Sequence, residues 1–512
     1  MIASVRRLLE SVRRHAVEGA LTVLSSVLVL TLLVSIVGRI AHPFCLEWME
    51  GAMVDHVARV TEGERIYVPP SLQFVPFVYP PVFYWLSAAM AVVTGLGFLP
   101  LRIVSVLATL GTIACVVGFV RREGAGWRAS MVAGGLFAGT FPLSGFYFDV
   151  GRVDALSVCL ALGSAYVARF GRGFSAVVGA ALLLTLAYHT KQSSLVLALP
   201  MIVYLLRVDR RRGFWFGGVL GVLVLGTSIV LDTVHGGWFG YYTHRVVSGH
   251  AVAWELVVPF VRGEILYPFG LALAVGSWVF LSRTPTGREH ARLFHGLLFA
   301  GLLVMAGLGR VHTGGWINVL MPLHAGIAIL VGLGLHAARS DGEGTSRRAG
   351  RFVTLMVVAQ LAVLLWDPRP SIPTEADRAA GRTWLDRVRS VPGPVWTTHR
   401  GHLTWLAGKD RHAHMMAMHD VMRSNADFGG AKSRLTADVE EAISSGRFDL
   451  VVMDNRDFWY LPALERHYER DATVWFEQPD VFWPRAGARL RPEFGYVRKG
   501  SLDREKPPPH LR

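Results

Sequence analysis

The sequence predicts a polytopic α-helical membrane protein with about 11 to 13 transmembrane helices and a soluble C-terminal α/β domain on the outer side of the membrane. Of the 512 residues, 52% are hydrophobic and only 18% are charged. Apolar runs of about 17 to 22 residues, the length that crosses the hydrocarbon core of a bilayer, recur between residues 20 and 366. The chain then turns polar, so we expect residues 367–512 to form a separate domain.

The apolar runs give the expected order of the spans. They fall near residues 20–38, 81–99, 101–120, 129–147, 153–170, 174–190, 193–206, 213–232, 265–281, 293–309, 315–338 and 351–366. Residues 1–19 are basic and precede the first run without a small-residue cleavage site, so we expect a cytoplasmic N-terminus and an uncleaved first span. Residues 20–366 would then form the membrane domain.

Arginine-rich loops between the runs predict the orientation of the chain. The loops expected in the cytoplasm are 121–128, 169–173, 207–213, 282–292 and 339–351. The segments left on the outer side are 39–80, 148–154, 189–192, 233–264, 309–315 and the C-terminal domain. These topology signals account for the net charge of +14, and since no basic stripe with interleaved aromatic residues occurs, we expect no nucleic-acid partner.

One pair of runs does not fit this alternation. The runs at 81–99 and 101–120 supply an even number of crossings where the charged loops require an odd number. Either one of them is re-entrant or interfacial, near the sequence TGLGFLP, or one boundary lies elsewhere.

The polar C-terminal part alternates strand and helix patterns. GPVWTTH and FDLVVMDN have the composition of strands, and AKSRLTADVEEAISS has that of a polar helix. We therefore expect a small α/β domain. It has no GxGxxG or P-loop motif, so the sequence names no nucleotide ligand.

Cysteine and histidine spacing predicts neither a disulfide framework nor a metal centre. The three cysteines lie in or beside apolar runs without a CxxC pattern, and the histidines of RHAHMMAMHD form no zinc ligand set. A divalent cation between Glu47, Glu50 and Asp154 is conceivable, but nothing in the sequence requires one.

The first outer loop, residues 39–80, is acidic, with five carboxylates between its Leu46 and Pro70. Met49 begins an apolar series at helical spacing, while Glu47 and Glu50 share another face. This pattern predicts an amphipathic helix that lies on the outer membrane surface with its acids away from lipid. The acids are either solvated loop charges or part of a site at the interface.

Polar residues also occur where other spans reach the same side. The candidate substrate-binding residues are Arg152, Lys191, Gln192, His244, Arg310 and Asn318. Ionisable groups at membrane depth are costly and therefore indicate function. For Arg152 and Lys191 the alternatives are snorkelling to the interface or an internal ion pair with Asp154, and each histidine alone fits an interfacial polar role better than a binding role.

Together these residues would place carboxylates and cations beside lipid on one face of the membrane. This combination suits the transfer of a sugar from a membrane-borne phosphate to a hydroxyl. The phosphate leaving group is a weak base, which cations stabilise without a general acid. The acceptor hydroxyl still needs a general base, and a carboxylate supplies one.

Four motifs follow one another in a familiar order. They are EG…ARVTEGERIY…FVYPPVFYWLSA…LRIVS, GRVDAL, TKQSS and GRVHTGGWINVLMP. In this order and sidedness they resemble membrane glycosyltransferases of the GT-C superfold, the group of protein mannosyltransferases and lipid A aminoarabinose transferases. The resemblance is to a bacterial branch with EG, RVD and KQ signatures, and it covers residues 20–340.

The resemblance implies a polyprenyl-phosphate sugar donor, inversion at the anomeric carbon, and catalysis on the extracytoplasmic face of a bacterial inner membrane. It also implies a first-loop carboxylate as general base, here Glu50 of MEG or Glu47. Many relatives carry adjacent Asp and Glu, whereas this chain has Glu-Trp-Met-Glu. Asp154 would orient the acceptor or the base. The cations expected to hold the donor phosphate are Arg152, Lys191 and Arg310, the last of which is usually Lys in this branch.

Other functions share some of these features. An O-antigen ligase or polymerase would use a lipid diphosphate donor at a similar cationic site. A lipid-linked sugar flippase or another transporter would carry broken helices and ionisable groups near mid-membrane. A third alternative is a non-catalytic membrane protein whose soluble domain binds a partner. The notable charges lie at span ends on one side, which favours a surface reaction. The sugar and the acceptor, whether glycan, lipid or protein, are not predicted.

Overall fold

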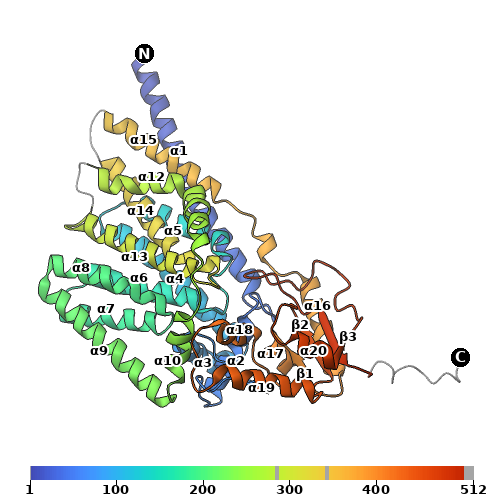
Figure 1. Ribbon diagram of the computed structural model, residues 1–512. Coiled ribbons are helices and arrows are strands. Elements are labelled where there is room, and N and C mark those ends of the chain that lie inside the picture. The colour runs from blue at the N-terminus through green and yellow to red at the C-terminus, as the bar shows by residue number, and fades with distance from the viewer. Residues whose placement is uncertain (1, 283–286, 341–344, 501–512) are drawn as a thin grey trace.

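The computed structural model describes residues 2–282, 287–340 and 345–500, and it consists of a helical bundle with a smaller domain at one end (Figure 1). The bundle and its loops contain α1 (Ile2–Arg39), α2 (Glu50–Thr61), α3 (Val82–Thr94), α4 (Phe98–Arg122), α5 (Trp127–Gly139), α6 (Val153–Phe170), α7 (Gly173–Tyr188), α8 (Ala198–Val208), α9 (Arg210–Val234), α10 (Trp238–Gly240), α11 (Val257–Pro259), α12 (Tyr267–Leu281), α13 (Ala291–Val311), α14 (Met321–Ser340) and α15 (Thr345–Val363). Shorter 3-10 or π-helical turns are η1 (Pro142–Ser144), η2 (Gln192–Leu197), η3 (Tyr241–Val246), η4 (Trp254–Leu256), η5 (Phe260–Leu266), η6 (Ile317–Leu320) and η7 (Arg369–Ser371).

The expected polytopic helical fold is confirmed. Seven segments of the described chain are long and apolar enough to cross a membrane, and they are His15–Arg39, Phe98–Arg122, Val153–Phe170, Arg210–Val234, Trp254–Leu281, Ala291–Val311 and Ile317–Ser340. Shorter apolar helices are Val82–Thr94, Gly173–Tyr188 and Gln192–Val208. The total of 11 to 13 crossings stays a prediction.

Helix α14 forms the centre of the bundle, and α9 lies at its edge. Nearly all of α14 is buried against α5, α12, α13 and α15, whereas α9 leaves many apolar side chains exposed, as a lipid-facing helix does. Glycines allow the close packing around α14, since a Cβ on Gly332 would lie 2.8 Å from Val120 Cγ2.

The loops expected on a common side of the membrane do meet in space. Glu123, in the first predicted cytoplasmic loop, accepts hydrogen bonds from Arg169 and from the backbone N–H of Arg288, which belong to two other such loops. The predicted outer loops gather at the other end, where Figure 1 also shows the C-terminal domain. The predicted sidedness is therefore consistent with the fold.

The pair of runs that broke the alternation is explained by α3. Its 13 residues span about 20 Å, less than the hydrocarbon core. It starts on the outer side, where the Val82 N–H donates to the carbonyl of His189, and after a turn through Gly95 and Gly97 the next helix starts on the same side, because its Arg102 reaches Glu50. This geometry favours the re-entrant or interfacial alternative for α3.

Helix α2 confirms the predicted helix of the first outer loop but not its surface position. Both its apolar residue Met53 and its acid Glu50 are completely buried, because α2 packs against α3 and α4 on one side and against the C-terminal domain on the other. The expectation that this helix lies on the outer membrane surface is corrected, because tertiary contacts cover both of its faces.

The C-terminal domain has the expected α/β character. Its strands are β1 (Val395–Thr397), β2 (Leu450–Met453), β3 (Tyr468–Arg470) and β4 (Phe494–Arg498), in the order β1-β2-β4-β3. The first pair is parallel, with Trp396 opposite Val451, and the other pairs are antiparallel. The helices are α16 (Glu375–Ser390), α17 (Gly401–Leu406), α18 (Met415–Arg423), α19 (Ala431–Ser444) and α20 (Leu461–His467).

Candidate active site

The two glutamates of the first outer loop have different environments. Glu50, the first residue of α2, is completely buried and receives both Nε and Nη2 of Arg102 at 2.8 Å. Its carboxylate also accepts the backbone N–H groups of Gly151 at 2.7 Å and Leu46 at 2.8 Å. These four donors fill the acceptor capacity of the carboxylate. Burial would raise the pKa of Glu50, but Arg102 and the other donors hold it below its ordinary value.

Arg102 connects Glu50 to the backbone of the first outer loop, so the ion pair has a structural role. Its guanidinium, in α4, also donates to the carbonyls of His42 and Phe44, and it has no solvent exposure. It thus joins the end of α1, the start of α2 and α4 at one point. The geometry of Glu50 suits a structural anchor, because its carboxylate already has four donors.

Glu47 has fewer donors. Its Oε1 accepts the hydroxyl of Tyr147 at 3.0 Å, and its Oε2 accepts the Met49 N–H at 3.0 Å and Arg152 Nη1 at 3.2 Å. Burial raises the pKa of Glu47 above its ordinary value, although Arg152 acts in the opposite direction. A buried carboxylate with a raised pKa and a single cationic partner has the properties of a general base.

A second ion pair lies close to the first, at the outer ends of α6 and η2. Asp154, in the first turn of α6, accepts Lys191 Nζ at 2.6 Å, as the ion-pair alternative for Lys191 proposed. Arg152, just before α6, pairs instead with Glu47 and donates to the hydroxyl of Tyr79 at 2.8 Å. Asn318 lines a small pocket together with Asp154 and Lys191.

The other candidate binding residues have partners elsewhere. Gln192 donates to the carbonyls of Val78 and Thr243, and the ring of His244 is 2.7 Å from the hydroxyl of Tyr188. Arg310 pairs with Glu264 of η5 at 2.8 Å. The structure therefore gathers Glu47, Arg152, Asp154, Lys191 and Asn318, whereas Glu50, Gln192, His244 and Arg310 make other contacts.

The acids considered for a divalent cation do not fit one. Glu50 is occupied by Arg102, Glu47 by Arg152, and Asp154 by Lys191. Within the described ranges, no group of three or more His, Cys, Asp or Glu residues has the arrangement of a metal site.

The C-terminal domain covers Glu47. The sequence predicted Glu47 as a candidate residue but did not predict this cover. The N–H groups of Arg485 and Ala486 donate to the carbonyl of Leu46, and Ala486 pairs with Glu47 as a parallel β-bridge. A Cβ on the next residue, Gly487, would lie 2.9 Å from Glu47 Oε1. The soluble domain therefore completes the surroundings of the carboxylate.

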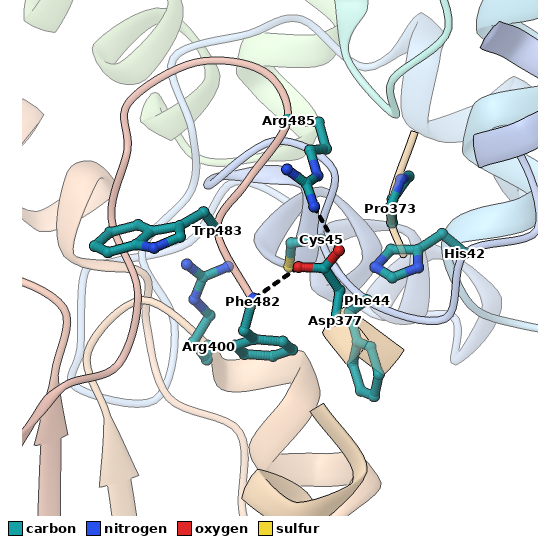
Figure 2. A pocket seen from close by; sticks show the side chains of 9 residues that line it. All are labelled: His42, Phe44, Cys45, Pro373, Asp377, Arg400, Phe482, Trp483 and Arg485. Atoms are coloured by element: carbon teal, nitrogen blue, oxygen red, sulfur yellow. Dashed lines mark hydrogen bonds and ion pairs between the residues drawn. The ribbon is translucent and has the colours of Figure 1, made fainter. Parts of the chain in front are cut away.

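Asp377 of α16 stabilises the same contact between the C-terminal domain and the first outer loop. Figure 2 shows its carboxylate facing Arg485 and the backbone N–H of Phe482, and both interactions are present. The pocket around it is small and is lined from the first outer loop by His42, Phe44 and Cys45. These contacts fix the segment that precedes Gly487.

Gly487→Ala is expected to lower both the Tm and kcat. The residue has φ +74°, and a Cβ would lie 2.7 Å from the hydroxyl of Tyr147 as well as 2.9 Å from Glu47. The matched control is Gly408→Ala, because Gly408 has φ +77° but open space around it. In both variants an alanine at positive φ destabilises the folded protein by about 1 kcal/mol. Only Gly487→Ala should also lower the activity of the molecules that remain folded. Equal activity of the two variants would contradict close packing on Glu47.

The fold and the site define a class of protein: a multi-span helical membrane protein with two carboxylate–cation pairs where the predicted outer loops meet. Residues 78–238 match the model of the dolichyl-phosphate-mannose-protein mannosyltransferase family. None of the curated protein sequences matches the chain.

Solved structures share the fold. ArnT from Cupriavidus metallidurans in the apo state aligns with a TM-score of 0.60 at 13% identity, over 94% of this chain and 98% of that one. The same protein bound to undecaprenyl phosphate aligns with a TM-score of 0.59 at 12% identity, over 94% and 99%. The archaeal oligosaccharyltransferase AglB from Archaeoglobus fulgidus, in complex with an inhibitory peptide and a dolichol-phosphate, aligns with a TM-score of 0.51 at 13% identity, over 87% and 72%.

These similarities confirm the GT-C superfold expected from the motifs. The family match covers residues 78–238, and the solved structures share the fold over most of the chain.

Proposed function

We propose that the protein transfers a sugar from a polyprenyl-monophosphate donor to a hydroxyl on the outer face of a bacterial inner membrane, with Glu47 as general base. The observation that carries the proposal is the pairing of Glu47 with Arg152 beside the Asp154 and Lys191 pair. It supplies a proton acceptor and two cations in one place. The N-terminus would be cytoplasmic and the C-terminal domain extracytoplasmic.

The proposed step is a single displacement. The acceptor oxygen forms a bond to the anomeric carbon while the bond from that carbon to the phosphate oxygen breaks, so the configuration inverts. The hydroxyl proton moves to Glu47, and Lys191 and Arg152 stabilise the departing phosphate. Since Glu47 is covered by Ala486 and Gly487, this segment has to move when the acceptor binds.

The surface beside η6 supports a lipid donor. An open groove of about 330 Å³ is lined by apolar residues that include Leu143, Tyr267 and Leu320, and it lies on one side of η6. Asn318, also in η6, lines the pocket of Asp154 and Lys191 instead. A polyprenyl chain in the groove would thus bring its phosphate near Lys191. The ArnT structure bound to undecaprenyl phosphate and the AglB structure with a dolichol-phosphate support a lipid of this class.

The test is donor turnover by the purified full-length protein in lipid. Radiolabelled polyprenyl-monophosphate sugars and the matching diphosphate sugars are supplied separately, and release of label to an acceptor or to water is measured. We expect turnover of a monophosphate donor only. Turnover of the diphosphate donor alone would favour the ligase or polymerase function, and label that crosses the vesicle membrane without cleavage would favour a transporter.

A further inference from the structure

A cavity of about 210 Å³ lies between the first outer loop and the C-terminal domain, and the proposed step does not use it. Its walls come from α2, from the segment around Phe74 and from residues 411–414. It opens beside the exposed residues Glu64 and Gln73. At the liquid share of one water, the cavity has room for about seven waters, which is the scale of one monosaccharide unit.

The wall contains buried polar atoms that lack hydrogen bonds. Asp55 is buried, and its Oδ1 has no hydrogen-bond partner among the described residues. The nearest cationic atom is Arg411 Nε at 3.4 Å, but this contact lacks hydrogen-bond geometry, and Arg411 Nη2 is also without a partner in the described chain. Buried polar groups are nearly always satisfied, so these atoms point to a polar ligand.

The charges of the wall disfavour a strongly anionic ligand. Arg411 pairs with Glu62 at 3.2 Å, and Arg59 pairs with Glu64 at 2.7 Å. With Asp55, the lining carries three carboxylates against two guanidinium groups. A phosphate would meet more negative than positive charge here.

The wall offers the contacts that a neutral sugar needs. Its carboxylates accept hydrogen bonds, its guanidinium groups and the amide of Gln73 donate them, and Ala52, Val75 and Ala413 supply apolar surface. Burial raises the pKa of Asp55 to about 7, so near neutral pH its carboxyl can accept or donate a hydrogen bond.

One wall of the cavity contacts the turn that carries the proposed base. His414 lines the cavity, and its Nε2 is 3.3 Å from the carbonyl of Trp48. Trp48 directly follows Glu47 in the turn before α2. A ligand that contacts His414 would therefore be separated from this turn by one side chain.

We propose that this cavity is an acceptor subsite that binds one neutral sugar unit of a polyhydroxylated acceptor. The sugar unit lies beside the hydroxyl that receives the transferred sugar, so the acceptor is a glycan or a glycolipid. This inference rests on the proposed transferase function.

The test uses neutral methyl glycosides as probes, with a methyl glucosaminide and a methyl glucuronide for comparison. Binding to the full-length protein in lipid nanodiscs is measured by saturation-transfer NMR. Gln73→Trp fills the mouth from an exposed position, and Asp55→Asn changes the unsatisfied carboxylate. The control is Gln478→Trp, the same change at an exposed residue outside the cavity.

We expect the wild type and Gln478→Trp to bind neutral glycosides, and both cavity variants to bind them about tenfold more weakly or not at all. Gln73→Trp answers the question even if Asp55→Asn fails to fold. Equal binding by Gln73→Trp and wild type, or binding of only the charged glycosides, would overturn the subsite.

Donor consumption by the wild type is measured separately. No consumption of any donor would refute the transferase function itself. If the wild type consumes donor, but Gln73→Trp and Asp55→Asn bind neutral glycosides as strongly as the wild type does, only the subsite is refuted.

Discussion

Glu47→Gln is expected to lower kcat by about 10²- to 10⁴-fold while the protein stays folded. The amide has the shape of the carboxylate, its oxygen can still accept from Arg152 and Met49, and its NH₂ can donate to the hydroxyl of Tyr147. Only the ability to take a proton is lost. The measurement is the initial rate with labelled donor at saturation, together with the Tm.

The pH profile separates this role from a structural one. The ionised carboxylate is the active form, so activity falls as pH decreases through the pKa of Glu47. Burial raises that pKa, so the acidic limb should lie above the ordinary range of glutamate. Residual activity of Glu47→Gln should lack this limb. The control is Glu440→Gln, an exposed acid of α19 that should keep the wild-type rate and profile. Full activity of Glu47→Gln would refute the assignment.

Arg102→Met is expected to destabilise the protein by about 3–5 kcal/mol, because it leaves the carboxylate of Glu50 buried without its cation. The carbonyls of His42 and Phe44 lose a donor as well. Thermal unfolding in detergent and the folded fraction on size exclusion measure the effect. An exposed control is Arg369→Met, whose ion pair with Asp367 lies at the surface and should contribute nothing measurable.

A double variant tests whether the unpaired charge of Glu50 causes this loss of stability. Arg102→Met combined with Glu50→Gln removes both charges, so we expect it to recover part of the stability that the first change loses. Glu50→Gln alone should lower the Tm more than Glu47→Gln does. Two results would show that Glu50 is not an anchor. One is a wild-type Tm for Arg102→Met, and the other is a loss of unfolding free energy in the double variant that exceeds the sum of the losses in the two single variants.

Much of the fold could be predicted because it depends on local sequence. The length of the apolar runs follows from bilayer thickness, so the spans were visible in the composition alone. The segments expected as strands contain β1 and β2, and the expected polar helix is α19. Strands β3 and β4 were missed, since they are only partly buried and lack the continuous apolar run that marks a fully buried strand such as β2.

The candidate site could be predicted only in part. The motifs supplied Arg152, Asp154 and Lys191, and the structure shows them at one end of the bundle with Glu47. Arg102 was missed as a site residue, although an arginine inside an apolar run is a signal of its own. No local signal marks Gly487, because its importance depends on what packs against it.

The sequence by itself predicted a polytopic membrane protein with acidic and basic groups at the ends of its spans on one side, because hydropathy and charge are properties of the chain. Only the tertiary structure decided which of two glutamates three residues apart is anchored and which is left with the weaker partners. That choice depends on Arg102 from α4, Arg152 before α6 and Gly487 from the last domain. A carboxylate acquires its pKa from the groups that surround it in space, and sequence spacing does not specify those groups.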